Sequence, residues 1–137
     1  MKFPADFCPP EGVEVSDFYT VINWFHQGTL FVYAKPDIQH SLDDAKKQVD
    51  YLARVSQNKG GSIFIDIRNA PPVSVEARNY YSSDEGRNNI TGICLLINSP
   101  VAKVVGNFYF HYINDKMKTK MVNKTSYGLD WLESLKC

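Results

Sequence analysis

Residues 62–78 read SIFIDIRNAPPVSVEAR, and this stretch indicates the fold class because it predicts a strand followed by a helix. The strand, at 62–68, turns three isoleucines to one face and Asp66 and Arg68 to the other, since side chains alternate along extended backbone. Two prolines end it, and Ser74 then stands where a helix-capping residue is expected. A strand followed by a helix is the repeating unit of an α/β sheet.

Upstream of this unit, residues 19–35 form two β-rich runs around Gln27-Gly28, which predicts a hairpin. The next run, from Pro36, places Ser41 three residues before an acid, a pattern typical of a capping box at a helix start. Apolar residues then recur at helical spacing. The sequence NKGG at 58–61 predicts the end of this helix, because glycine tolerates the left-handed turn that follows it.

Downstream, a short helix is expected at 74–85 and a strand buried on both faces at 91–98. Residues 99–112 predict a helix that begins with Ser-Pro. Residues 116–122 alternate lysine with less polar residues, as suits an edge strand. Residues 125–136 predict a final helix, in which three side chains lie one above another: Tyr127, Trp131 and Leu135.

These elements predict one α/β domain over residues 13–137, preceded by a loose Pro-rich arm at 1–12. An opening β-hairpin followed by successive βα units predicts a mixed, mainly parallel five-stranded sheet packed by four helices.

The composition excludes several classes of function. Lys plus Arg equals Asp plus Glu at 15 each, so no general basic field attracts nucleic acid. There is no signal-peptide pattern and no apolar stretch long enough to span a bilayer, and the three cysteines form no CxxC motif. We therefore expect a cytoplasmic protein without disulfides. The three histidines show no metal-ligand spacing and no nucleotide-binding glycine motif occurs, so neither metal nor cofactor is expected.

From about residue 19 onward the chain resembles the STAS-like superfamily, whose best-known members are anti-sigma-factor antagonists. Within it, the chain is most similar to an uncharacterised group of small bacterial proteins. The strings that carry the resemblance are FIDIRNA (64–70), SVEAR (74–78), LLINSPVAKVVGNF (95–108) and WLESL (131–135). The resemblance implies a STAS-like fold and regulation of a partner through surface contact.

Ser74 has two interpretations. It corresponds, by order of elements, to the hydroxyl that is phosphorylated in classical STAS antagonists, which implies a candidate phosphoacceptor. The local sequence, PVSVEA, departs from the classical Asp-Ser-x-Gly pattern. A plain helix cap is therefore the favoured interpretation.

Two further groups of residues are candidate sites. Four charged residues near the carboxyl end of the middle strand could form a partner or anion site, although a structural ion-pair network is the commoner arrangement: Asp66, Arg68, Glu76 and Arg78. Aromatic residues in two predicted helices could form an interface or line an apolar groove, or they could form a thick core: Tyr80, Tyr81, Phe108, Tyr109, Phe110 and Tyr112.

We therefore expect a non-enzymatic STAS-like regulatory or protein-interaction module, with an unidentified protein partner and no catalytic residues. The aromatic excess at 108–112 also predicts a homodimer, because a two-fold interface needs only one self-complementary patch. One alternative is a domain that binds a small apolar ligand or lipid in a groove between aromatic helices. A weaker alternative is an enzyme that uses Asp66, Arg68 or Glu76.

Overall fold

A computed structural model describes residues 3–87, 90–98 and 118–136. Its strands are β1 (Ser16–Asp17), β2 (Val21–His26), β3 (Thr29–Ala34), β4 (Gly61–Asp66), β5 (Ile90–Leu96) and β6 (Lys118–Val122). Its helices are α1 (Leu42–Val55), α2 (Val75–Ser82), α3 (Asp84–Arg87) and α5 (Thr125–Ser134). The helix expected at 99–112 lies outside the described residues.

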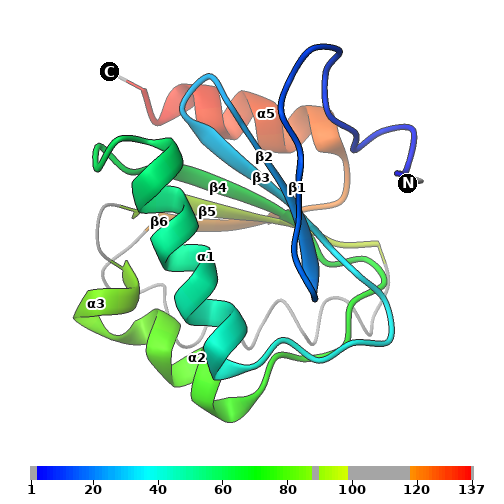
Figure 1. The fold of residues 1–137 in the computed structure, drawn as a ribbon. Helices are drawn as coiled ribbons and strands as arrows, with labels where there is room; N and C mark the ends of the chain where they lie inside the picture. The colour runs from blue at the N-terminus through cyan, green and yellow to red at the C-terminus, as the bar shows by residue number, and fades with distance from the viewer. Residues whose placement is uncertain (1–2, 88–89, 99–117, 137) are drawn as a thin grey trace.

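The strands form one sheet in the order β1-β2-β3-β4-β5-β6. The pairs β1–β2 and β2–β3 are antiparallel, and the three following pairs are parallel. Helices α1, α2 and α3 cover one face, while α5 and the N-terminal stretch lie on the other (Figure 1). The mixed, mainly parallel α/β architecture expected from the sequence is confirmed, with β6 at an edge as its lysines indicated.

The hairpin and the first helix follow local sequence rules. Gln27 and Gly28 both have positive φ (51° and 81°), which is the two-residue turn that matches the twist of a hairpin. At the start of α1, the Ser41 hydroxyl accepts from the Asp44 N–H, and the Ser41 N–H donates to the Asp44 carboxylate at 2.9 Å. The chain leaves α1 through positive-φ residues that include Gly60, as expected.

The helix expected at 74–85 is two helices, α2 and α3, which meet at Ser83. The Ser83 hydroxyl donates to the Tyr80 carbonyl and accepts from the Gly86 N–H at 3.1 Å, so its side chain replaces helical backbone bonds. A Cβ atom at Gly86 would collide with the Tyr80 carbonyl. Glycine therefore permits the tight return of α3 onto the end of α2.

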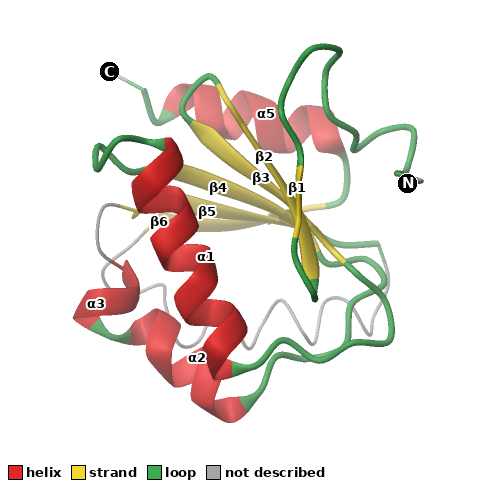
Figure 2. Cartoon of the chain, in the orientation of Figure 1, coloured by secondary structure: helices red, strands yellow, loops and turns green. Residues whose placement is uncertain are grey.

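Two expectations about the start of the chain are corrected. Within the part of the chain that the structure describes, the sheet has six strands rather than five, because Ser16–Asp17 pairs with β2. Residues 3–12 contain no helix or strand (Figure 2), but they are not a loose arm, because Phe7 is only 2% exposed. The Phe7 ring lies 5.3 Å from the rings of both Trp24 and Phe64, so this stretch forms part of the core.

The sheet divides the core into two layers. On the α5 face, Phe7, Trp24 and Phe64 pack with Leu132 of α5. The expected stripe of α5 is displaced: Gly128 and Leu132 are buried, whereas Tyr127 is 52% exposed. The reason is close packing, because a Cβ atom at Gly128 would collide with the Phe64 ring. On the opposite face, α1 packs on aliphatic residues of β2, β3 and β4, and this layer contains the candidate site.

Candidate functional site

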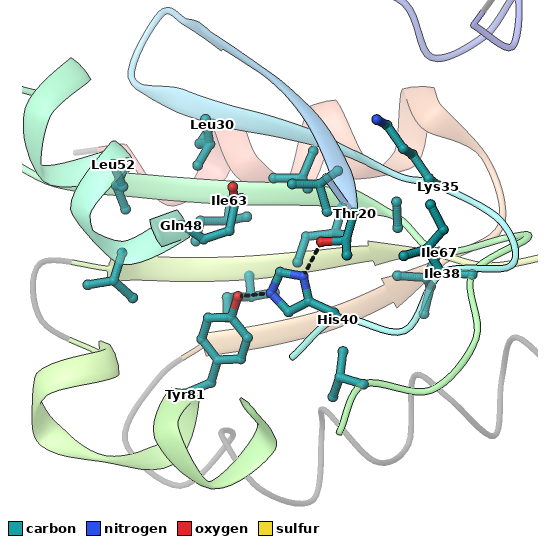
Figure 3. A pocket seen from close by; sticks show the side chains of 18 of the residues that line it. Thr20, Leu30, Lys35, Ile38, His40, Gln48, Leu52, Ile63, Ile67 and Tyr81 are labelled. Atoms are coloured by element: carbon teal, nitrogen blue, oxygen red, sulfur yellow. Dashed lines mark hydrogen bonds between the residues drawn. The ribbon is translucent and has the colours of Figure 1, made fainter. Parts of the chain in front are cut away.

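A pocket lies between the sheet and helices α1 and α2, and we call it the α1–α2 pocket (Figure 3). Its cavity volume is about 70 Å³. Its walls are mainly aliphatic side chains, which come from the sheet, from α1 and from the loop that follows β4. They include Val32, Leu52, Ile63, Ile65, Ile67 and Ile93. Alternation along β3 and β4 explains this surface, since every second residue turns to the same face.

Three polar side chains meet at this pocket, and we call them the His40 cluster: Thr20, His40 and Tyr81. Nδ1 of His40 lies 2.7 Å from the Thr20 hydroxyl, and Nε2 lies 2.6 Å from the Tyr81 hydroxyl (Figure 3). Both ring nitrogens are therefore hydrogen-bonded, one as donor and one as acceptor in a neutral imidazole. The rings of His40 and Tyr81 are also nearly parallel, at 11°.

Residue 40 is placed by the starts of two helices. His40 immediately precedes the Ser41 cap of α1, and its carbonyl accepts from the N–H of Ser74, the cap of α2, at 2.9 Å. Thr20 immediately precedes β2, and Tyr81 lies near the end of α2. The His40 cluster thus connects the sheet to both ends of α2.

The electrostatics of the pocket leave little charge inside it. Burial lowers the pKa of His40 to about 4, which outweighs the opposite effect of Asp44, so the imidazole is neutral at pH 7. Lys35 also lines the pocket, but its ammonium group donates to Asp17 at 2.7 Å and to the Phe18 carbonyl at 2.8 Å. The pocket therefore combines aliphatic walls with neutral hydrogen-bonding groups.

A buried pair of amide side chains links β2 to α1 beside the pocket. The amides of Asn23 and Gln48 exchange two hydrogen bonds, at 2.7 and 3.0 Å. Asn23 is fully buried, so this pairing satisfies groups that would otherwise cost about 1–3 kcal/mol each. The pair fixes how α1 sits on the sheet beside the pocket.

The four charged candidate residues do not form one site. Asp66 is 2% exposed, on the α5 face, and Arg68 donates to it through Nε at 3.0 Å and Nη2 at 2.9 Å. Arg68 also donates to Asp6 through Nη1 and Nη2, both at 2.8 Å. These two carboxylates raise the pKa of Arg68, and Arg68 lowers the pKa of Asp6. The guanidinium therefore links the N-terminal stretch to β4.

Glu76 and Arg78 lie on α2, which packs against α1 on the other face of the sheet. Glu76 is exposed and Arg78 is partly buried. The structure thus separates them from Asp66 and Arg68.

Ser74 caps α2: its hydroxyl accepts from the Ala77 N–H at 3.1 Å. Its candidate role as a phosphoacceptor stays a prediction. Among the aromatic candidates, Tyr81 lines the pocket and Tyr80 packs beside it, with the ring centroids 6.3 Å apart. The remaining four, at 108–110 and 112, lie outside the described residues, so the homodimer expected from them also stays a prediction.

Two observations bear on catalysis and metal binding. Burial raises the pKa of the Cys94 thiol to about 12, so this side chain is protonated at neutral pH. Within 3–87, 90–98 and 118–136, no group of three or more His, Cys, Asp or Glu side chains could hold a metal ion.

The sequence interpretation missed His40 as a site residue because it considered histidines as metal ligands or as partners of a nucleophilic cysteine, and not as buried hydrogen-bonding groups. The available signal was local: His40 immediately precedes a capping box, in the loop where the chain leaves β3 and enters α1. Its partners Thr20 and Tyr81 are 20 and 41 residues away, so no short motif contains them.

Lowering the pH from ~7.5 to ~5 is expected to reduce the free energy of unfolding by about 2 kcal/mol through His40 alone. In the unfolded chain the imidazole takes up a proton near its ordinary pKa of 6.5, whereas the pKa is about 4 in the folded protein. Between these values the unfolded state binds the extra proton. The contribution of His40 to the free energy of unfolding is therefore complete above pH 6.5 and is lost as the pH falls towards 4.

Urea unfolding at stepped pH measures this effect. A His40→Gln variant should lose this part of the pH dependence, and His26→Gln, which removes a partly buried imidazole of β2, is the matched control. Identical pH profiles for the wild type and His40→Gln would contradict the assignment.

A family described as a domain of unknown function, DUF7793, matches residues 23–136. No protein of curated function matches the chain. Among the described residues, no helix has both the length and the apolar composition that a membrane crossing requires.

Among solved structures, the chain is similar to an uncharacterised protein of the DUF3478 family, with a SpoIIAA-like fold, from Shewanella loihica PV-4. The two share 11% sequence identity with a TM-score of 0.56, over 88% of this chain and 92% of that chain. At this identity the likeness shows the fold alone. The STAS-like fold expected from the sequence is thereby confirmed, and the chain belongs to the DUF7793 family.

Proposed function

We propose that this protein is a non-enzymatic binding module, which holds a small apolar group of a ligand in the α1–α2 pocket. The observation that carries the proposal is the pocket itself, an aliphatic cavity with a few converging neutral polar groups. Ligand sites typically have this composition, with apolar walls for affinity and a few polar groups for orientation. The apolar-ligand alternative from the sequence analysis, with Tyr81 at the pocket, is thus the function that the geometry supports best.

The cavity is larger than ordinary packing defects. Protein interiors are close-packed, with few voids larger than a water molecule, and a cavity needs only about 10–15 Å³ to hold one water. A volume of about 70 Å³ lined mainly by isoleucine, leucine and valine exceeds that several-fold. Aliphatic cavities stay dry and take up apolar molecules, because water gains no hydrogen bonds in them.

The position of the pocket supports a regulatory role. Tyr81 of α2 belongs to the His40 cluster. In addition, the His40 carbonyl accepts a hydrogen bond from the backbone N–H of Ser74, the N-cap of α2. A ligand that shifts His40 would therefore shift α2. In STAS-like proteins, as the resemblance implies, the start of this helix is the region through which partners are regulated.

Xenon is expected to bind in the α1–α2 pocket of the wild type and to perturb the methyl signals of Ile63, Ile65 and Ile93 in NMR spectra. An Ala34→Leu variant should lose this response, because Ala34 lines the pocket and the larger side chain would fill it. Ala53→Leu is the matched control, since Ala53 lies on α1 and is not among the described lining residues. Absence of a xenon response in the folded wild type would contradict the proposal.

A second candidate function, docking of a protein partner at the start of α2, is favoured by one observation. Val75 is 54% exposed, directly after the Ser74 cap. An exposed aliphatic residue beside a partly exposed hydroxyl is a suitable centre for a small, regulated contact. Under this candidate, phosphoserine at position 74 would be found by mass spectrometry in protein from the native host.

Replacing Ser74 by alanine is expected to lower the free energy of unfolding by about 1 kcal/mol, because the cap hydrogen bond to Ala77 is lost. Ser74→Asp should be nearly neutral, since aspartate also caps and its charge suits the helix N-terminus. Denaturant unfolding of both variants measures the difference. A larger loss for Ser74→Asp than for Ser74→Ala would contradict the cap assignment.

A further inference from the structure

We propose that the group entering the α1–α2 pocket is an uncharged aliphatic alcohol, with its hydroxyl on Thr20 of the His40 cluster. This inference rests on the proposed function, because it names the ligand class of the same pocket. The volume of the cavity limits how much of the ligand can be buried in it. A cavity of about 150 Å³ takes up benzene, so about 70 Å³ accommodates roughly three or four non-hydrogen atoms.

The charges around the pocket exclude an ionic ligand group. Among its described lining residues, Lys35 has the only charged side chain, and there is no Asp or Glu. The ammonium group of Lys35 is held by Asp17 and the Phe18 carbonyl, and it points away from His40 (Figure 3). A carboxylate or ammonium ligand would lose its hydration without gaining an opposite charge, which is strongly unfavourable.

His40 does not supply that charge. Both of its ring nitrogens already have partners, and its side chain is buried between the sheet and α2. The charged side chain of the neighbouring helix that acts on it is Asp44, at the start of α1. The depressed pKa of His40 agrees with a site that is neutral at pH 7.

The hydrogen bond between Thr20 and His40 favours an alcohol over a carbonyl group or a hydrocarbon. If Nδ1–H donates to Thr20, the hydroxyl proton of Thr20 can be donated to a ligand oxygen. If Thr20 instead donates to Nδ1, its oxygen can accept from a ligand hydroxyl. A ligand hydroxyl both donates and accepts, so it pairs with Thr20 in either tautomer. A carbonyl pairs in only one, and a hydrocarbon pairs in neither.

The test compares three probes of one carbon skeleton on the full chain at pH 7.5: 1-propanol, propionate and propylammonium. Titrations are followed by NMR at the methyl groups of Thr20, Ile63 and Ile93. We expect 1-propanol to bind at least tenfold more tightly than either ion. Propionate or propylammonium binding as tightly as 1-propanol would overturn the inference, and so would a Lys35→Met variant that selectively weakens propionate.

A Thr20→Val variant should weaken 1-propanol binding about tenfold, as expected for one lost hydrogen bond, and should leave xenon binding unchanged. Thr29→Val is the matched control, because it removes a buried hydroxyl that bonds to Ser62 outside the pocket lining. Equal losses of 1-propanol binding in both variants would overturn the role of Thr20. The comparison of probes on the wild type remains decisive if Thr20→Val does not fold.

The outcomes separate this inference from the proposed function. Xenon binding without a preference for 1-propanol would overturn the alcohol assignment and leave the binding module intact. Failure of xenon and of all three probes to perturb the pocket would overturn both.

Discussion

Replacing Phe7 by alanine is expected to lower the free energy of unfolding by about 3–5 kcal/mol. Phe7 belongs to a stretch without regular secondary structure, yet its side chain is only 2% exposed. Its ring contacts those of Trp24, Phe31 and Phe64, at 5.3–6.0 Å between centroids. Truncation would leave a cavity between the sheet and its N-terminal cover, and the surrounding rings could fill it only in part.

Denaturant unfolding followed by circular dichroism measures this loss. Tyr19→Ala is the control, since Tyr19 is 72% exposed and its truncation should change stability by less than about 0.5 kcal/mol. If Phe7→Ala lowered the free energy of unfolding as little as Tyr19→Ala, the stretch would be the loose arm that was expected from the sequence.

Replacing Arg68 by methionine is expected to lower the free energy of unfolding by about 3–5 kcal/mol, because it leaves the Asp66 carboxylate buried without its cation. Asp66 is 2% exposed and is held by the guanidinium and by the Arg68 N–H at 3.0 Å. Only the backbone contact of these would survive the substitution. Urea unfolding at pH 7.5 gives the change in stability.

The double variant Asp66→Asn/Arg68→Met is the internal control, since removing both charges also removes the unpaired carboxylate. It should be more stable than Arg68→Met alone. Asp6→Ala should cost less than about 1 kcal/mol, because the Asp6 side chain is 53% exposed and its ion pair is screened by water. A double variant less stable than Arg68→Met would show that the pair is not coupled as described.

The hydrogen bonds of Arg68 bear on the two interpretations of Asp66 and Arg68. Nε, Nη1 and Nη2 of Arg68 all donate to protein carboxylates. An anion-binding role, as considered from the sequence, would require Arg68 to exchange one of these partners for a ligand. The contacts of Arg68 form a structural ion-pair network, but this network links β4 to the N-terminal stretch through Asp6, whereas the sequence suggested a network that ties the strand to the following helix.

The local features of this protein could be predicted from short stretches of its sequence. The hairpin turn at Gln27-Gly28, the capping box at Ser41 and the cap at Ser74 each depend on residues within about four positions of one another, so their chemistry is visible in a short string. The alternation of side chains along each strand is also visible within its own stretch of sequence, and the order of elements follows from reading these stretches in turn. Together with right-handed crossovers, they are enough to predict a mainly parallel α/β sheet.

Which distant side chains meet depends on how the helices, strands and loops pack in three dimensions. Arg68 reaches Asp6 across 62 positions, and His40 reaches Tyr81 across 41. Phe7 is buried without any periodicity, because what covers it is the α5 face of the sheet and not its own neighbours. Such contacts depend on how helices and loops pack on the sheet, and packing is set by the shapes of all the surfaces that meet rather than by any one segment. For that reason the fold could be predicted, whereas the pocket and the His40 cluster could not.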